Sequence, residues 1–175
     1  MATPTIDALR AVGDFALKFR WNLAISQFPA LGTWPSSDDL NIRCESAELP
    51  KKIGSSTEIK IRGHKVKQPA IYGYTNSQQF TFVETIDNKI SAMLKQWSDL
   101  AWTPQTGVSN QKSQIQGQIL LQRLDNQNNA IWQYTMVGCY LENYDPGGQL
   151  GGDAGEALKP SIQLSYDYFL DNPVG

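Results

Sequence analysis

Hydrophobic and polar residues alternate along several segments of the chain, and this period-two pattern predicts β-strands. In KFRWNLAIS, residues 18–26, the apolar side chains Phe19, Trp21, Leu23 and Ile25 fall on one face. The segment LNIRCESAEL, residues 40–49, alternates in the same way and stops at a proline, which cannot donate to a ladder. Residues 76–87 repeat the pattern. The first half of the chain therefore predicts three half-buried strands.

The second half of the chain predicts a hairpin and a closing strand. SQIQGQILLQRL (113–124) and AIWQYTMVGCYL (130–141) are separated by the turn-forming run DNQNN (125–129). SIQLSYDYFLD (161–171) places Ile162, Leu164, Tyr166 and Tyr168 on one face. A glycine-rich segment, residues 143–160, joins the hairpin to this strand and is expected to be a mobile loop.

One segment has helical periodicity instead. Residues 87–101, DNKISAMLKQWSDLA, repeat apolar side chains at i, i+3, i+4 and i+7, and Asp87 is in position to cap the start. The predicted core residues of this helix are Ile90, Met93, Leu94, Trp97 and Leu100. Residues 1–17 are expected to form an arm or a short helix, since Gly13 stops a brief helical pattern. We therefore predict one mainly β domain over residues 1–175, a small β-barrel or two-sheet sandwich with one flanking helix.

The segment 51–72 stands out by its charge. Residues 51–69, which follow Pro50, contain six of the 15 lysines and arginines and one acid, Glu58. TEIKIRGHKVKQ predicts a two-stranded ribbon with a turn at Gly63–His64, a thin apolar face and a cationic face. A lone hairpin is barely stable in water, so the ribbon must lie on its own domain or on a neighbour. The candidate interface residues are Lys51, Lys52, Ile53, Ile59, Lys60, Ile61, Arg62, His64, Lys65, Val66 and Lys67.

Three roles are open for this ribbon. Docking to an acidic neighbouring protein surface is favoured. A solvated cationic face is the second reading, and direct binding of nucleic acid is the third, because the ribbon lacks interleaved aromatic residues for base stacking. The whole chain carries a net charge of −2, so no global field attracts it to nucleic acid or anionic lipid.

Composition narrows the class of protein. Apolar runs are only a few residues long, so no membrane segment is expected, and the N-terminus has no apolar core that would indicate a signal peptide. Cys44 and Cys139 are far apart and are expected to be buried thiols of a protein that folds in a reducing cytoplasm.

Residues that support catalysis or metal binding are sparse. The single histidine, His64, lies at a predicted turn, and the chain has no G-x-S-x-G elbow. DNQNNA lacks the third-position acid and the glycine of a calcium loop, and the glycine-rich segment has no phosphate-binding signature. We therefore expect no enzyme, no metal and no cofactor.

Taken in order, these segments resemble the tail tube proteins of contractile-tailed bacteriophages. FRWNLAISQFP is similar to the opening strand of the family, and IRCESAELP to its strand that ends in acid-x-Leu-Pro before a long basic loop. IYGYTN, QQFTFVETIDNKISAMLKQWSDL, YTMVGCYLENYD and SIQLSYDYF resemble the following turn, the strand–helix block and the late strands. The resemblance covers about residues 18–102, 134–142 and 161–169. The chain departs from the family after VGCY, where Pro146 comes later than usual and a glycine-rich insertion follows.

The resemblance implies a structural virion protein. Family members form hexameric rings that stack into the inner tail tube, and double-stranded DNA passes through the lumen without specific binding during genome delivery. The implied partners are other copies of the chain, the tail sheath protein, the baseplate tube initiator, the tail terminator and the tape-measure protein. The implied location is the virion tail, assembled in the host cytoplasm.

Two alternatives are kept. The fold is also used by baseplate tube initiators and by the tube protein of type VI secretion. From another class, a carbohydrate-binding β-sandwich would use exposed tryptophans as stacking platforms. The periodicity leaves mainly Trp34 and Trp102 free for that purpose.

Overall fold

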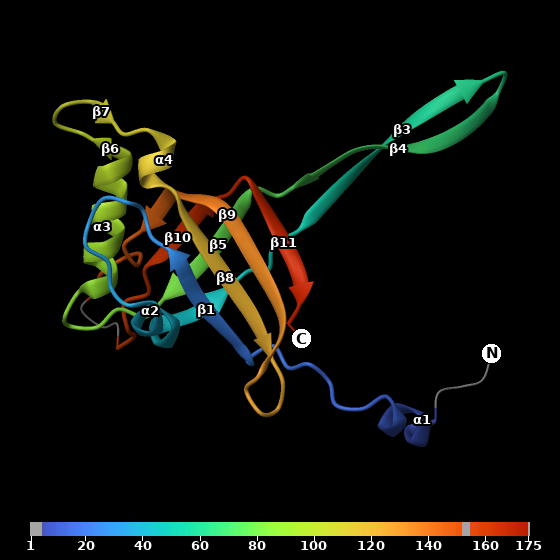
Figure 1. The fold of residues 1–175 in the computed structure, drawn as a ribbon, viewed down its shortest axis with the longest axis horizontal. Helices are drawn as coiled ribbons and strands as arrows, with labels where there is room; N and C mark the ends of the chain where they lie inside the picture. Colours follow the sequence, from blue (N-terminus) through green and yellow to red (C-terminus); the bar gives the residue numbers. More distant parts are fainter. Residues whose placement is uncertain (1–4, 152–154, 175) are drawn as a thin grey trace.

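The computed structural model describes residues 5–151 and 155–174, and its dominant feature is a pair of antiparallel sheets that share one long strand (Figure 1). The helices are α1 (Ile6–Ala11), α2 (Ser37–Arg43), α3 (Lys89–Ala101) and α4 (Lys112–Ile115). The strands are β1 (Trp21–Gln27), β2 (Cys44–Ala47), β3 (Lys52–Ile61), β4 (His64–Tyr74), β5 (Ser77–Phe82), β6 (Trp102–Thr103), β7 (Val108–Ser109), β8 (Gly117–Leu124), β9 (Ala130–Asp145), β10 (Ser161–Ser165) and β11 (Tyr168–Pro173).

Strand β9 connects the two sheets. Its first half pairs with β8 and β11, and its second half pairs with β10, so that the strands follow the order β1-β8-β9-β10-β5-β2. The change of sheet falls at Gly138, where φ is +71° and a Cβ would lie 2.3 Å from the carboxylate of Asp167. Only glycine fits a left-handed backbone this close to another side chain.

The barrel is not closed, because β1 and β2 at the ends of this order do not pair. Helix α2 covers the free edge of β1 instead. Asn41 Oδ1 accepts the Leu23 N–H at 2.7 Å, and Ser37 Oγ accepts the Ile25 N–H at 2.8 Å. These side chains satisfy edge donors that would otherwise be open to another strand. The mainly β, two-sheet prediction is confirmed, whereas the barrel alternative is not, and α2 and α4 are helices that were not predicted.

The strand predicted over residues 40–49 was wrong in its first half. Residues 37–43 form α2, with Ser36 accepting the Asp39 N–H as N-cap, and only Cys44–Ala47 is strand. Leu40 is fully buried while Ile42 is 84% exposed, so the two do not share a face as predicted. A capping serine and acids in the first turn outweigh a short alternating pattern.

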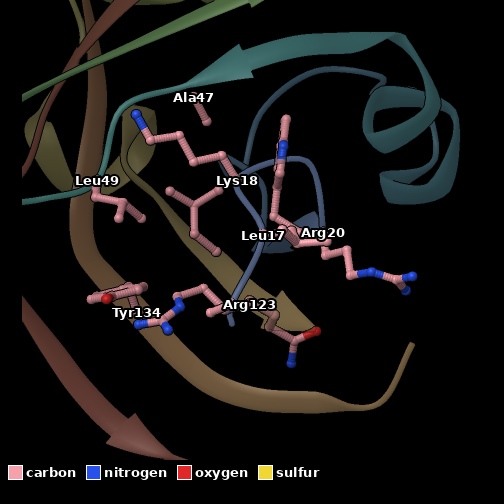
Figure 2. Close-up of a pocket in the computed structure, with 11 residues that line it drawn as sticks. Leu17, Lys18, Arg20, Ala47, Leu49, Arg123 and Tyr134 are labelled. Atoms are coloured by element: carbon pink, nitrogen blue, oxygen red, sulfur yellow. The ribbon is translucent and has the colours of Figure 1, made fainter. Parts of the chain in front are cut away.

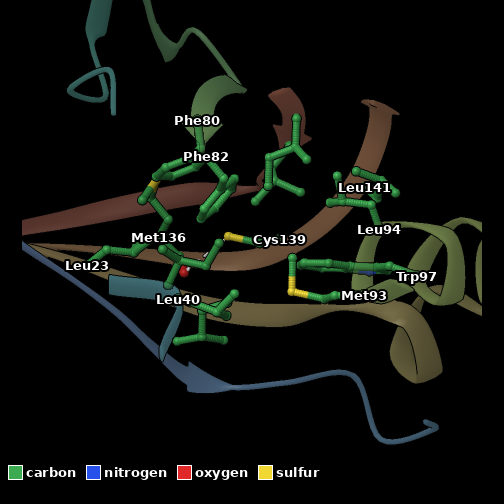
Figure 3. Packing of buried hydrophobic residues seen from close by; sticks show 14 of the residues in the cluster. Leu23, Leu40, Phe80, Phe82, Met93, Leu94, Trp97, Met136, Cys139 and Leu141 are labelled. Carbon is green, nitrogen blue, oxygen red and sulfur yellow. Dashed lines mark hydrogen bonds between the residues drawn. The ribbon is translucent and has the colours of Figure 1, made fainter. Parts of the chain in front are cut away.

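Helix α3 flanks the strands and supplies much of the core (Figures 1 and 3). Four of its five predicted core residues, Ile90, Met93, Leu94 and Trp97, are buried, and Leu100 is half-buried. The Trp97 indole N–H donates to the Ile115 carbonyl at 2.9 Å, which satisfies a buried donor. The expected Asp87 cap was wrong, because Asn88 occupies the N-cap position.

The carboxylate that reaches the start of α3 is Glu84. It accepts the Ser91 N–H and hydroxyl at 2.6 Å each and the Ile90 N–H at 3.3 Å. Asp87 pairs with Arg43 at 3.0 Å and thereby ties the α3 entry to α2. A cap supplied from outside the helix cannot be found by inspecting the residue next to it.

Other boundaries also differ from the sequence prediction. Phe19 lies before β1 and is exposed, so the first strand begins two residues later than its apolar alternation. Residues 112–115 form α4, and the strand predicted over 113–124 starts at Gly117. The closing segment divides into β10 and β11, which join different sheets, so Tyr168 is exposed and Phe169 is buried.

Candidate assembly surfaces

The basic ribbon predicted over residues 51–72 is present, and it projects away from the two sheets (Figure 1). Strands β3 and β4 pair antiparallel from Lys52↔Tyr74 to Ile61↔His64. The ten residues of β3 span about 30 Å at the usual strand rise. Every residue from Lys51 to Tyr72 is exposed in the isolated chain. The ribbon therefore does not lie on its own domain.

The register of the ribbon separates its apolar side chains from its cations. Ile59↔Val66 and Ile61↔His64 are cross-strand pairs on one face. On the other face Lys60↔Lys65 is a pair, and Glu58 Oε1 lies 3.6 Å from both lysine Nζ atoms. The tip is a turn at Arg62 and Gly63, with φ of +47° and +85°, one residue earlier than predicted. One face can thus bury apolar area on a partner, while the other presents positive charge.

The root of the ribbon is fixed to the body. Lys52 Nζ pairs with Asp171 of β11 and lies 5.3 Å from the centre of the Phe169 ring. Tyr74 packs edge-on against Phe169, and Thr75 Oγ1 lies 2.9 Å from the Tyr166 hydroxyl. These contacts hold the direction of the ribbon while leaving its outer two-thirds without support.

The eleven residues predicted for the interface therefore fall into two groups. Lys51, Lys52 and Ile53 lie at the root, whereas the other eight lie at the tip. Sequence reasoning missed Ile71 and Tyr72, which are 78% and 73% exposed on β4. Tyr72 pairs with Gly54 across the ribbon, and its ring packs over that glycine. A glycine facing an aromatic residue in a predicted hairpin is visible in the sequence, so this residue could have been identified from it.

A second surface is the outward side of β5 and β10, here called the polar face. It consists of Ser77, Gln79, Thr81, Ser161, Gln163 and Ser165, which pair across the two strands as Ser161↔Thr81, Gln163↔Gln79 and Ser165↔Ser77. The intervening Phe80, Phe82, Ile162 and Leu164 are buried in the core. These six side chains therefore point away from the core and carry no charge. Acidic residues of β9 border this face: Glu142 accepts from Gln163 at 3.3 Å, and Asp145 pairs with Ser161.

The aromatic side chains give little support to a sugar-binding surface. Trp34, which the periodicity left free, stacks on Phe28 at 5.5 Å and meets Trp97 edge-on at 5.6 Å. Trp102 is 55% exposed and is the most exposed tryptophan of the chain. A single exposed tryptophan does not make the row of tryptophan platforms that glycan binding would use here.

The side chains that could take part in catalysis or metal binding lie apart from one another. His64 begins β4 on the exposed ribbon. Cys139 is buried and Cys44 is half-buried, and burial raises the pKa of each thiol to about 12. Within the described residues, no three histidines, cysteines or carboxylates come together as metal ligands, and none of the helices has the length and apolar character to span a bilayer.

Comparison with known structures defines the fold. The chain is similar to one chain of the PVC sheath/tube terminator of an extracellular contractile injection system, with 10% identity, a TM-score of 0.67, and coverage of 92% of this chain and 99% of that chain. It is also similar to a chain of the PVC sheath–tube complex, with 11% identity, a TM-score of 0.66, and coverage of 97% and 99%. A chain of the anti-feeding prophage baseplate aligns with 8% identity, a TM-score of 0.67, and coverage of 91% and 97%.

The fold is therefore that of chains found in contractile injection systems, and the predicted resemblance to tail tube proteins is confirmed at the level of fold. No protein-family model matches the chain, and no curated protein sequence matches it. At this level of identity the likeness describes the fold alone.

Proposed function

We propose that this protein is a structural subunit that assembles into hexameric rings, which stack into the inner tube of a contractile particle. The observation that carries the proposal is the ribbon: its root is held by contacts to β11, its residues from Lys51 to Tyr72 are exposed, and it has one apolar and one cationic face. Exposed apolar area on a projecting element marks a surface for another protein. The fold shared with chains of contractile injection systems supports the same reading.

In the proposed tube the ribbon lies away from the bore and reaches a neighbouring subunit or ring. Its Ile59, Ile61 and Val66 would be buried there, and Lys60, Arg62 and Lys65 would face acidic groups of the neighbour. A head-to-tail contact that closes gives a ring, and a second contact that does not close extends rings into a filament. The ribbon suits the second contact, because it extends beyond the body that would form the ring.

The polar face is the proposed lining of the bore. Hydroxyl and amide side chains hydrate well, so this face does not need a protein partner to cover it. It also carries no lysine or arginine, and DNA binding derives its affinity from cations that neutralise phosphates. A duplex can therefore slide past such a surface without being held.

The cargo and setting extend the resemblance to tail tube proteins, and the lining is compatible with them. We propose that the tube conducts double-stranded DNA into a host cell as part of a phage tail, with sheath, terminator, tape-measure and initiator proteins as partners. A tube initiator of a baseplate or a type VI secretion tube would use the same fold with a different neighbour above or below the ring. A role in catalysis is not part of the proposal.

Sedimentation velocity of the purified chain tests this function. The expected result is a concentration-dependent shift from monomer to a hexamer and then to larger species, which weakens as salt screens the charged contacts. A single monomeric boundary at every concentration would contradict a self-assembling tube subunit.

A further inference from the structure

The arm at the N-terminus is an element without a partner in its own chain. Ile6 and Val12 are 68% and 70% exposed, and the hydrogen bonds described for residues 5–13 all stay within the arm. A helix of six residues is not stable in water by itself. Helix α1 lies apart from the sheets in Figure 1, beyond a bend at Gly13 with φ of +91°. The helix therefore requires a surface on which to pack.

A matching surface lies where the arm leaves the body. The basal pocket has a volume of about 440 Å³ and is lined by apolar side chains, among them Leu17, Trp21, Leu49, Leu121 and Tyr134 (Figure 2). Leu17 and Leu49 remain 45% and 48% exposed at its mouth. The pocket has room for two aliphatic side chains, so it offers the arm the apolar cover that it lacks.

The basal pocket is positively charged and therefore favours an occupant that carries a carboxylate. Lys18, Arg20 and Arg123 line it together with no carboxylate. In the described part of the chain, the Arg20 guanidinium donates only to the carbonyls of residues 125 and 126 and to Asn128 Oδ1, and Arg123 has no ion-pair partner. A guanidinium beside apolar walls favours an incoming carboxylate. The basic ribbon would be repelled here, whereas the arm carries two acids, Asp7 and Asp14, and one base.

We infer that the arm of one copy docks in the basal pocket of a second copy, with Ile6 of α1 and the following Val12 inside it and Asp7 facing Arg123. Asp14 Oδ2 accepts from Asn126 of its own chain at 2.5 Å, so the arm stays attached at residue 14 while α1 is free to reach outward. In each copy the arm begins at the rim of that copy's own basal pocket and fills the pocket of the next copy. The same contact can therefore be repeated around a ring. The inference rests on the proposed function because it needs copies side by side.

Disulfide trapping between two differently tagged chains tests the exchange. One chain carries Val12→Cys and the other carries Leu49→Cys, and the two are mixed and oxidised under assembly conditions. The native thiols stay protonated because burial raises their pKa. The expected product is a mixed dimer on a non-reducing gel. The matched control is Val12→Cys with Val108→Cys, an exposed valine outside the pocket, which should cross-link at least tenfold less.

A charge exchange tests the contact between Asp7 and Arg123. Arg123→Glu in the pocket chain should lower the mixed product at least tenfold, and Asp7→Lys in the arm chain should restore it. Arg123→Met keeps the apolar wall and separates loss of charge from misfolding. Normal assembly by sedimentation without the mixed product, or an internal disulfide in a monomeric Val12→Cys/Leu49→Cys double variant, overturns this inference and leaves the proposed function in place. A chain that sediments only as monomer overturns the proposed function instead.

Discussion

The ring of Tyr74 meets the ring of Phe169 edge-on, with centroids 5.2 Å apart and planes at 67°. Tyr74 is the last residue of β4 and Phe169 lies on β11, so this contact joins the ribbon to the sheet of β1, β8, β9 and β11. Tyr134 and Tyr166 also pack around Phe169. The direction of the ribbon is thus set by the aromatic core rather than by the ribbon itself.

Tyr74→Ala should loosen the ribbon while the sheets remain folded. We expect the free energy of unfolding to fall by about 2 kcal/mol, from lost apolar burial and the aromatic pair. Assembly should weaken at least tenfold, because a mobile ribbon must be ordered when it docks. Chemical denaturation and sedimentation measure the two effects. Tyr168→Ala removes an exposed tyrosine of β11 and should leave both nearly unchanged.

Lys60→Glu/Arg62→Glu should uncouple ring formation from tube growth. Reversing the charge at the ribbon tip replaces attraction to an acidic neighbour with repulsion, while the body that forms the ring is unaltered. Electron microscopy should find rings without tubes. The control Lys89→Glu/Lys95→Glu makes the same charge change on α3 and should still form tubes. Tubes of normal length from the ribbon variant would contradict a role in stacking.

Gln79→Lys/Gln163→Lys should convert the bore into a DNA-binding surface. Lysines on the polar face would neutralise phosphates, so assembled tubes should retain duplex DNA with an affinity that falls steeply as salt rises. Gln105→Lys/Gln127→Lys places the same charges on exposed loops and serves as the control. Equal DNA retention by both variants would argue against β5 and β10 lining the bore.

Glu84→Gln should destabilise the entry of α3. Burial disfavours the charged form, but hydrogen bonds from Ser91, Thr85 and Ile90 outweigh it, so the pKa of Glu84 lies below its usual value. Its contribution to stability is therefore present above the unfolded pKa of about 4.3 and is lost as pH falls through the lower folded pKa. The variant should lose about 1–2 kcal/mol at pH 7. Urea denaturation between pH 7 and pH 3 should show that this difference shrinks at low pH.

Gly117→Ala tests the close approach of β8 to the end of β1. An alanine Cβ there would lie 2.6 Å from the carbonyl oxygen of Gln27, which is backbone and cannot rotate away. We expect a cost of about 1–3 kcal/mol in thermal or chemical unfolding. Gly73→Ala, which meets no atom within 4 Å, should be close to neutral. An unchanged midpoint for Gly117→Ala would mean that the two strands separate easily.

Long segments with one dominant period were predictable from the sequence. The hairpin of β8 and β9, strand β5 and the buried stripe of α3 follow directly from where their apolar residues recur. The ribbon was also predictable, because its alternation of isoleucines and lysines is nearly unbroken. In these segments local pattern and tertiary packing favour the same structure.

Segments governed by distant contacts were not predictable. Residues 37–43 alternate like a strand, yet Ser36 caps a helix there, and Asn41 and Ser37 of that helix accept from the edge of β1. The closing segment reads as one strand, but Asn76 holds the Tyr166 and Asp167 carbonyls where it divides into two. The basal pocket joins side chains more than 100 residues apart, so its unpaired Arg123 is invisible to any local pattern.

The most direct test of the central claim is electron microscopy of the purified full chain at high concentration. We expect hexameric rings and hollow tubes, with the polar face toward the bore and the ribbon reaching the next subunit or ring. Monodisperse monomers at every concentration, or assemblies in which the ribbon stays solvent-exposed, would contradict it.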